Sequence, residues 1–480
     1  MGTGIDCVTR ITSHFDWFLK DGLADSGSAA CQMWRSSMET IADGAVRKEV
    51  QVPSLPQTHY RSIMAPGGCT LYYDQPLLVA AYDLSAYTGK RCYAEAADNY
   101  VADFLQRCVA RNGIFLWGNH YYWHAGLGQT VKFVGEEQPY PVQLAEETGD
   151  YHEVRPIPPA WEIFWKLSAG AAEKEIRTFV TNSLFDQQGG FNRHADGKKG
   201  CAFLESGGIM VVSLAYLYRR IKNPALLELA DKIVDFSFSH RHEKTGLLEN
   251  NPTQTRWDKF VSTTEIGLWA SCLLKAVELT GRQKWLDKAR AAVRAYLSYG
   301  YEEATGKYLG QLLVDTGTSP FVTPCSKIAG NAIYQPGRYS EPWRQFFPSH
   351  DYPLQMAETC LELYRLTGEE IFRVACQRWA EQMMKDYQEC RQQGRVFYAE
   401  RYGRCLHFLW RCSQVLGEKE YLQKASFLAE EALASLWQGR MFRSHTGEDR
   451  YQAVDGLGYL FLSLLCLELN EEVEMMGTFW

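Results

Sequence analysis

The feature that most constrains this chain is a recurrence: six times, an amphipathic helical stretch ends in a short turn and a second helical stretch follows. A Gly, a short apolar run and a cluster of polar and aromatic residues come after each pair. The turns begin at Thr88, Ser168, Ile221, Thr280, Thr367 and Leu416. Helix pairs repeated every roughly 50 to 90 residues cannot bury their apolar faces alone and must pack on their neighbours. The sequence therefore predicts an all-α (α/α)6 toroid, a ring of six hairpins with short β pieces in the loops at one end.

Helical periodicity is clear within these stretches. Leu226, Leu229 and Ile233 recur at three- and four-residue spacing, and Glu228 and Asp231 fall between them. The repeat continues from about residue 71 to residue 469 without a Pro/Gly/Ser-rich linker. We predict two parts, a helical N-terminal lead-in over residues 1–65 that packs on the ring and a toroidal catalytic domain over residues 66–480.

Charge and hydropathy exclude several classes of function. The net charge of -7 comes from mixed charges with no basic run, which disfavours nucleic acid as a partner. The longest apolar stretch, GYLFLSLLCLEL, is too short to span a bilayer, and residues 1–20 lack the pattern of a secretory signal. The 14 cysteines include no C-x-x-C pair and are expected to be free thiols. These features predict a cytoplasmic protein without a membrane partner, and they leave its oligomeric state open.

The clusters after the hairpins hold the residue types that perform chemistry, including eight of the 11 histidines in or beside them. Their aromatic residues include Trp117 and Tyr122, which are expected to stack on sugar rings or, alternatively, to fill the inner barrel. Arg256, Lys259 and Arg338 are expected to bind substrate, with solvated surface charge as the alternative for Arg256 and Lys259.

Three of the cluster residues suit a metal. His120, Glu153 and His194 supply two imidazoles and a carboxylate, a ligand set for a divalent ion such as Mn, Zn, Fe or Ca. The alternative is that these side chains bond to the loop backbone. Arg193, directly before His194, is expected to bind a substrate anion. Rival ligands stand nearby: His124, His152, Glu136, Glu137, Glu146 and Glu147.

The hairpins resemble the (α/α) toroid carbohydrate-active enzymes, which include N-acylglucosamine 2-epimerases and six-hairpin glycosidases. The order Trp-Gly-x-His, then Glu, then Arg-His after a Gly-Gly-Phe turn is similar to family 2 pectate lyases. That resemblance implies metal-assisted β-elimination on an acidic, pectate-like polymer. His120, Glu153 and His194 would hold the metal and Arg193 would abstract the proton beside the carboxylate. Tyr402 or His407 would protonate the leaving oxygen, unless they only line the inner helices.

Two other reactions fit the clusters. A sugar 2-epimerase or isomerase would use a histidine pair from His350, His407 and His445. A glycoside hydrolase would use two carboxylates, for which the candidates are Asp196, Asp351, Glu400, Asp449 and Asp455. A non-catalytic carbohydrate-binding toroid is disfavoured, because convergent unpaired charges are costly unless they are used.

Overall fold

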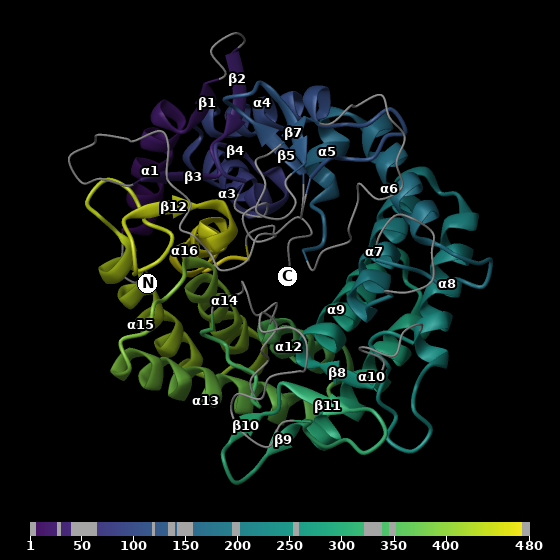
Figure 1. The fold of residues 1–480 in the computed structure, drawn as a ribbon. Coiled ribbons are helices and arrows are strands. Elements are labelled where there is room, and N and C mark those ends of the chain that lie inside the picture. Colours follow the sequence, from purple (N-terminus) through teal and green to yellow (C-terminus); the bar gives the residue numbers. More distant parts are fainter. Residues whose placement is uncertain are drawn as a thin grey trace.

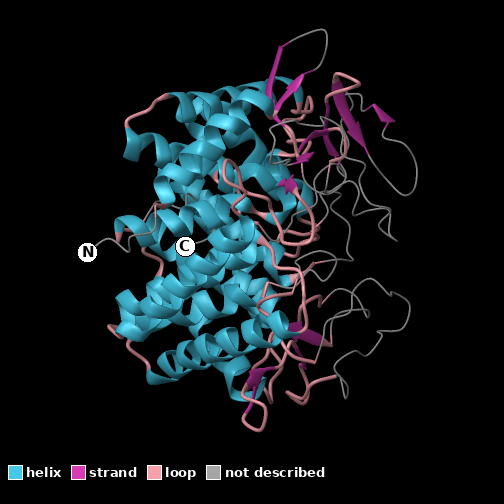
Figure 2. Ribbon diagram, turned by 90° about the vertical axis from the view of Figure 1, so that its left-hand side faces the viewer, coloured by secondary structure: helices cyan, strands magenta, loops and turns pink. Residues whose placement is uncertain are grey.

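The computed structural model describes residues 6–25, 30–39, 65–117, 121–132, 140–141, 157–193, 202–252, 259–320, 338–344 and 352–472. These residues form 14 α-helices, with short turns at one end of the molecule and longer loops with short strands at the other (Figure 2). Twelve helices make six consecutive hairpins: α3 (Leu71–Thr88) and α4 (Cys92–Arg107), α5 (Trp161–Leu167) and α6 (Ala169–Ser183), α7 (Leu204–Ile221) and α8 (Pro224–Ser239), α9 (Thr263–Thr280) and α10 (Gln283–Gly300), α12 (Pro353–Thr367) and α13 (Glu370–Gln392), α14 (Ala399–Leu416) and α15 (Lys419–Leu436).

Each of the six predicted turns joins the two helices of one hairpin. The first begins at Thr88, the last residue of α3, and the sixth begins at Leu416, the last residue of α14. In four hairpins a glycine with positive φ ends the first helix: Gly89, Gly281, Gly368 and Gly417. Glycine adopts this left-handed conformation without a Cβ clash, so a Gly after a helical stretch is a strong stop signal.

The first helices of the hairpins stand side by side as an inner wall, and the second helices surround them (Figure 1). α7 packs on α9, α9 on α12, α12 on α14, α14 on α16 (Leu457–Leu469), and α16 on α3. The short helix α5 is linked to both α3 and α7 by hydrogen bonds at its N-terminal end. Ala160 N, before α5, donates to Gln75 Oε1 of α3 (2.7 Å), and Trp161 Nε1 donates to Ser213 Oγ of α7 (2.9 Å). The predicted (α/α)6 toroid of six hairpins is confirmed, and α16 adds a further helix to its inner wall.

The two ends of the chain close this ring. Glu468 near the end of α16 accepts hydrogen bonds from the backbone N–H groups of Cys7 (2.7 Å) and Val8 (2.9 Å) at the start of α1 (Cys7–Asp21). At the middle of both helices the rings of Phe15 and Phe461 lie 5.7 Å apart. α1 therefore runs antiparallel to α16 as its outer partner, and the described residues contain a seventh helix pair besides the six hairpins. The domain boundary at residue 65 stays a prediction.

Short antiparallel strands lie in the loops at one end of the toroid, as the sequence predicts (Figure 2). The largest sheet has the order β4-β5-β6-β7, and a pair between β3 and β12 ties the N-terminal segment to the segment before α16. The strands are β1 (Leu23–Asp25), β2 (Ala30–Trp34), β3 (Ser37–Glu39), β4 (Gly68–Cys69), β5 (Tyr121–His124), β6 (Gln129–Lys132), β7 (Tyr140–Pro141), β8 (Phe260–Ser262), β9 (Tyr301–Glu302), β10 (Lys307–Tyr308), β11 (Gln311–Leu313) and β12 (Arg450–Gln452). A 3-10 turn, η2 (Ala453–Asp455), joins β12 to α16.

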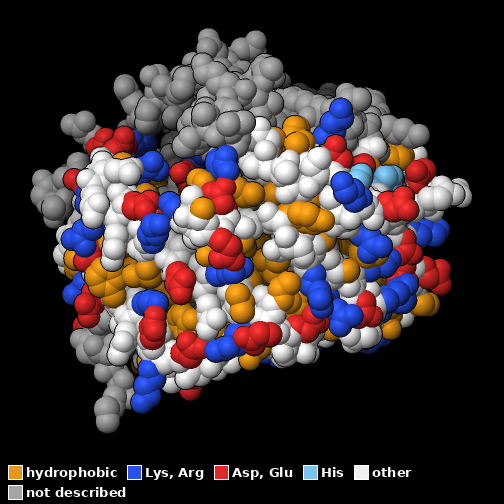
Figure 3. Space-filling view, turned by 90° about the horizontal axis from the view of Figure 1, so that it is seen from below, with side chains coloured by type: hydrophobic (Ala, Val, Ile, Leu, Met, Phe, Trp, Pro, Cys, Tyr) orange, Lys and Arg blue, Asp and Glu red, His pale blue; other side chains and the backbone are white. Residues whose placement is uncertain are grey.

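The outer surface carries mixed charge. On the face seen in Figure 3, Lys and Arg side chains alternate with Asp and Glu side chains. Among the described residues, no helix combines the length and the apolar composition that crossing a membrane requires.

Glycines set the spacing of the inner wall. A Cβ on Gly458 of α16 would lie 2.2 Å from the Leu77 backbone nitrogen of α3. A Cβ on Gly403 of α14 would lie 2.4 Å from the Leu460 nitrogen of α16, and one on Gly267 of α9 would lie 2.5 Å from the Met356 nitrogen of α12. The obstacles are backbone atoms, which a rotamer change cannot move. These helix pairs therefore pack more closely than any side chain would allow.

Replacing Gly458 by Ala is expected to destabilise the fold by about 1–3 kcal/mol, because α16 and α3 must move apart. The matched control is Gly170→Ala in α6, where an added Cβ would meet nothing within 4 Å. That control is expected to be neutral or stabilising by up to about 1 kcal/mol, since Ala has the higher helix propensity. Urea unfolding followed by circular dichroism measures both, and equal effects of the two substitutions would contradict the packing argument.

Candidate functional site

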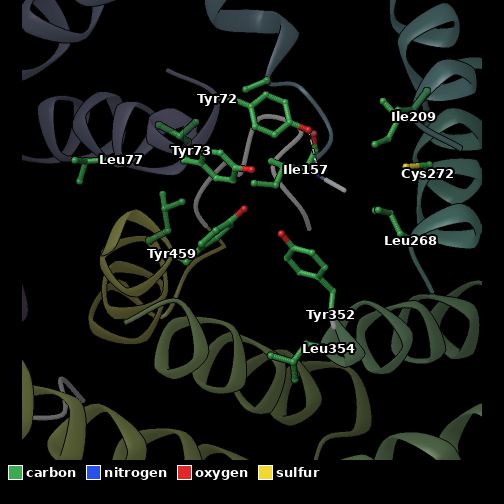
Figure 4. Close-up of a cluster of buried hydrophobic side chains, with 14 of the residues drawn as sticks. Tyr72, Tyr73, Leu77, Ile157, Ile209, Leu268, Cys272, Tyr352, Leu354 and Tyr459 are labelled. Atoms are coloured by element: carbon green, nitrogen blue, oxygen red, sulfur yellow. Dashed lines mark hydrogen bonds between the residues drawn. The ribbon is translucent and has the colours of Figure 1, made fainter. Parts of the chain in front are cut away.

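Three tyrosines point into the middle of the ring. Tyr73 comes from the first turn of α3, Tyr352 directly precedes α12 and Tyr459 comes from the first turn of α16 (Figure 4). All three side chains are buried. Several inner-wall helices follow directly on strands or on η2, so their N-terminal ends lie at the loop end of the toroid. The tyrosines therefore sit where the polar clusters converge.

A layer of buried charge lies beside these tyrosines. Arg404 Nη2 of α14 is 2.7 Å from Glu358 Oε2 of α12, and Arg404 Nη1 is 3.5 Å from Glu400 Oε1 one turn earlier in α14. The side chains of Arg404 and Glu358 are only 1% and 3% exposed. Arg401 Nε lies 2.9 Å from Glu400 Oε2, and its guanidinium carbon is 5.9 Å from the Tyr352 ring centroid. Glu400 is thus engaged by two guanidinium groups.

A second carboxyl group, that of Asp455 at the end of η2, lies next to Glu400. A Cβ on the following residue, Gly456, would sit 2.6 Å from the Glu400 Cβ. Asp455 is 8% exposed, and burial raises its pKa to about 8. Arg450 opposes this rise, whereas the negative charges of Glu448 and Glu400 add to it. At neutral pH the Asp455 carboxyl group therefore retains its proton.

His445 is a polar neighbour of Asp455. Its Nε2 lies 3.9 Å from Asp455 Oδ2, and its Nδ1 accepts a hydrogen bond from Gly447 N (3.2 Å). Since Nδ1 accepts, the hydrogen of the neutral ring is on Nε2 and faces Asp455. Burial lowers the pKa of His445 to about 4, so the ring is neutral at physiological pH.

The predicted aromatic residues Trp117 and Tyr122 are both buried. The Trp117 ring packs behind Tyr72 at 5.1 Å and against Phe164 at 5.2 Å. The Tyr122 hydroxyl donates to the Pro66 carbonyl (3.1 Å). Trp117 belongs to the main apolar core, whereas Tyr122 packs with Ala65 and Val131 in a separate small cluster. Sugar stacking by either ring stays a prediction.

The predicted cations are dispersed. The Arg193 guanidinium lies over the Phe203 ring at 4.3 Å and is half-buried. Lys259 is exposed. Arg338 forms an ion pair with Glu302 (2.5 Å) near the short strand β9. The structure does not bring these three residues to the tyrosine cluster in one group, and their substrate contacts stay predictions.

Tyr402 and His407 lie on α14 away from the Glu400 and Asp455 pair. Tyr402 is buried among Trp343, Tyr387 and Phe397, with its hydroxyl 3.4 Å from that of Tyr387 on α13. His407 is fully buried, and burial holds its pKa well below its usual value, helped by the charges of two neighbouring arginines. Tyr402 stands in the first turn of α14 but packs toward α13, and His407 lies farther along the same helix, so their catalytic roles stay untested predictions.

Several predicted residues lie outside the described part of the chain: His120, Glu153, His194, His350, Arg256, Asp196 and Asp351. The metal site and the His350 base therefore remain predictions. Among the residues that the structure does describe, no group of three His, Cys, Asp or Glu side chains could hold a metal ion.

The sequence interpretation missed most of the residues that form the tyrosine cluster and the buried charges beside it. Tyr73, Glu358, Arg401 and Arg404 were not candidates, although all stand in the first two turns of inner-wall helices. Tyr352 stands inside the cluster PSHDYP but carried no assigned role. A signal was present for Glu358, Arg401 and Arg404, because α12 and α14 begin inside or directly after a polar cluster, so their first turns lie at the same end as that cluster.

No protein-family model matches the chain, and no curated protein matches it. Solved structures are similar at low identity. A D-mannose isomerase is 10% identical with a TM-score of 0.48, covering 97% of each chain. A cellobiose 2-epimerase from Bacillus thermoamylovorans is 10% identical with a TM-score of 0.47, covering 96% of this chain and 98% of that one. An α-1,6-mannanase of Salegentibacter sp. HEL1_6 is 8% identical with a TM-score of 0.46, covering 97% and 100%. Such low similarity does not assign a reaction, and the resemblance to family 2 pectate lyases stays a prediction.

Proposed function

We propose that this chain is a carbohydrate-active enzyme, a glycoside hydrolase that acts on a neutral glycan at the loop end of the toroid. Asp455 is the general acid, and Glu400 is the second carboxyl group of the pair. The observation that carries the proposal is the buried carboxyl group of Asp455, with its pKa raised to about 8, next to a carboxylate engaged by two arginines.

Glycoside hydrolysis needs two carboxyl groups in different protonation states. One donates a proton to the oxygen of the leaving group, and the other activates water or stabilises the positive charge that develops on the sugar ring. When the environments of two neighbouring carboxyl groups favour opposite protonation states, these states show which group acts as the acid and which as its partner. Burial keeps Asp455 protonated, and Arg401 and Arg404 form ion pairs with Glu400.

The charge balance favours a neutral substrate. Arg401, whose guanidinium carbon is 5.9 Å from the Tyr352 ring, and the neighbouring Arg404 are both paired with carboxyl groups of the chain. A uronate would have to compete with Glu400 and Glu358 for them. The tyrosine hydroxyls and rings suit the hydroxyl groups and apolar faces of a neutral sugar instead. The toroidal arrangement, which resembles carbohydrate-active enzymes, supports a carbohydrate substrate of either charge.

A substrate screen tests the proposal against its alternatives. Purified protein is incubated with neutral glycans and with polygalacturonate, and three products are monitored: new reducing ends, the ultraviolet absorbance of an unsaturated uronate, and deuterium incorporated from solvent into free monosaccharides. We expect reducing ends from a neutral glycan without the absorbance. Chelator-sensitive absorbance on polygalacturonate would support the lyase instead, and deuterium incorporation would support the epimerase. Either result would overturn the hydrolase proposal.

A further inference from the structure

A buried carboxyl group, that of Asp74, joins three elements that are far apart in the sequence. Asp74 stands in the first turn of α3 and is 1% exposed. Its Oδ1 accepts a hydrogen bond from the Tyr451 hydroxyl of β12 (2.8 Å), and its Oδ2 accepts one from the Tyr100 hydroxyl of α4 (2.8 Å). Among the described residues, no lysine, arginine or histidine forms an ion pair with it. The carboxyl group is therefore held by the two tyrosines alone within that part of the chain.

Burying a carboxyl group without a cation is costly, even when hydrogen bonds satisfy its oxygens. An apolar side chain of similar volume is often no less stable at such a position. In some proteins a buried polar group is retained because it fixes the relative position of the segments that it joins. The segments joined by Asp74 are the inner-wall helix α3, the outer helix α4 and the strand β12.

The strand β12 leads directly to the proposed acid. It continues into η2, and η2 ends at Asp455. Within the described part of the chain, the Asp455 side chain makes no hydrogen bond of its own, and His445 Nε2 approaches it only to 3.9 Å. The location of its carboxyl group therefore depends on the backbone of η2. That backbone is held by the hydrogen bond from Ala453 N to the Ser36 carbonyl (2.8 Å) and, through β12, by the contact between Tyr451 and Asp74.

We propose that Asp74 is a positioning residue for the reaction: its hydrogen bond to Tyr451 fixes β12 and η2 and thereby holds the Asp455 carboxyl group beside the leaving oxygen. This inference rests on the proposed function, in which Asp455 is the general acid. A general acid must lie within hydrogen-bond reach of the oxygen that it protonates, so a small displacement of η2 lowers the rate without removing a reacting group. The Tyr100 hydroxyl secures the same carboxyl group to α4, which is not part of the segment that carries Asp455.

The two tyrosines supply a matched pair of variants. Tyr451 and Tyr100 are 1% and 0% exposed, and each Phe substitution removes one hydroxyl group from the same carboxyl group. Tyr451→Phe is expected to lower kcat about 10- to 100-fold and to change KM by less than about twofold, because the substrate still binds but meets a displaced acid. Tyr100→Phe is expected to keep kcat within about twofold of the wild type. With folding verified by circular dichroism, equal kcat values for the two variants would overturn the proposal.

Two substitutions of Asp74 test the carboxyl group itself. Asn has the shape of Asp and, in either orientation of its amide, keeps a hydrogen bond to the Tyr451 hydroxyl, whereas Ala leaves that hydroxyl without its partner. We expect Asp74→Asn to keep kcat within about fivefold of the wild type and Asp74→Ala to lose as much as Tyr451→Phe does. Equal kcat values for Asp74→Asn and Asp74→Ala would show that this hydrogen bond does not position the acid.

Hydrogen–deuterium exchange separates this inference from the proposed function, because it follows the backbone amides of residues 450–456 and needs no substrate. We expect these amides to exchange about fivefold faster in Tyr451→Phe and at the wild-type rate in Tyr100→Phe, since loss of one buried hydrogen bond favours local opening by about that factor. Unchanged exchange in Tyr451→Phe would overturn the inference even if the protein hydrolyses a glycan. A protein that hydrolyses no neutral glycan would refute the proposed function, and the exchange rates would still confirm or contradict the contact that holds η2.

Discussion

Replacing Asp455 by Asn is expected to lower kcat about 10²- to 10⁴-fold on the glycan that the chain hydrolyses, because the amide cannot donate the proton that the leaving oxygen needs. Asn has nearly the same shape as Asp, so the segment around η2 should keep its structure. KM is expected to change little, since the general acid acts mainly in the transition state. Steady-state kinetics, with circular dichroism to verify folding, measures the effect.

The pH dependence of activity gives an independent check. The Asp455 pKa is raised to about 8, so the carboxyl group carries its proton below that pH and loses it above. The wild-type kcat is expected to fall as pH rises through about 8, and this alkaline limb should be absent in Asp455→Asn. Because the pKa of Asp455 is higher in the folded protein than in the unfolded chain, its bound proton also stabilises the fold. This stabilisation is fully present below the unfolded-state pKa and is lost as pH rises through the folded-state pKa. The Asn variant should therefore unfold with a weaker pH dependence over that window.

Asp449 supplies the matched control. It stands in the same cluster but is exposed, and it accepts a hydrogen bond from Gln438 (2.5 Å) and pairs with Arg443 (3.0 Å). Asp449→Asn is expected to leave kcat within about twofold of the wild type, because exposed pairs contribute little. Glu400→Gln should lower kcat substantially. Equal activities of the Asp455 and Asp449 variants would contradict the assigned acid.

The hairpins could be predicted because their signals are local. Helical periodicity and a Gly that ends a helix involve residues within a few positions of one another, and such signals located all six turns. The pairing of α1 with α16 depends on Cys7 and Glu468, which are 461 positions apart. No local pattern reports such a contact. Likewise, the apolar runs at residues 113–117 and 394–398 form no strand; among the described residues each makes a single bridge, Val109 to Phe115 and Tyr398 to His445.

The sequence could predict which polar clusters hold the site, but not which residues of each cluster face it. Glu400 and Asp455 were candidates for a hydrolase, and the structure brings them together. Tyr402 comes only two residues after Glu400, but each residue turns a helix by about 100°, so the two side chains leave α14 on different sides. Which side faces the ring depends on packing against α12 and α16, and composition alone does not reveal it.

Replacing Glu358 by Leu is expected to destabilise the toroid by about 3–5 kcal/mol, because it leaves Arg404 buried without its closest carboxylate. Glu400 lies farther from Arg404, at 3.5 Å, and is shared with Arg401. The control is Glu420→Ala, which removes an exposed partner of Lys424 on the outer helix α15 and should cost less than about 1 kcal/mol. Urea unfolding followed by circular dichroism gives both values.

The double variant Glu358→Leu/Arg404→Met separates structural from functional reasons for the buried pair. Replacing both charges by apolar side chains removes the uncompensated charge, so stability is expected to return to the wild-type value or to exceed it by about 1–4 kcal/mol. Glu400 keeps its contact with Arg401 in this variant, but it loses Arg404. If the pair serves the reaction by fixing Glu400, the double variant should be stable and yet have a reduced kcat. A variant that is stable and fully active would mean that Glu358 and Arg404 serve only the fold, and one that stays destabilised would contradict the charge argument itself.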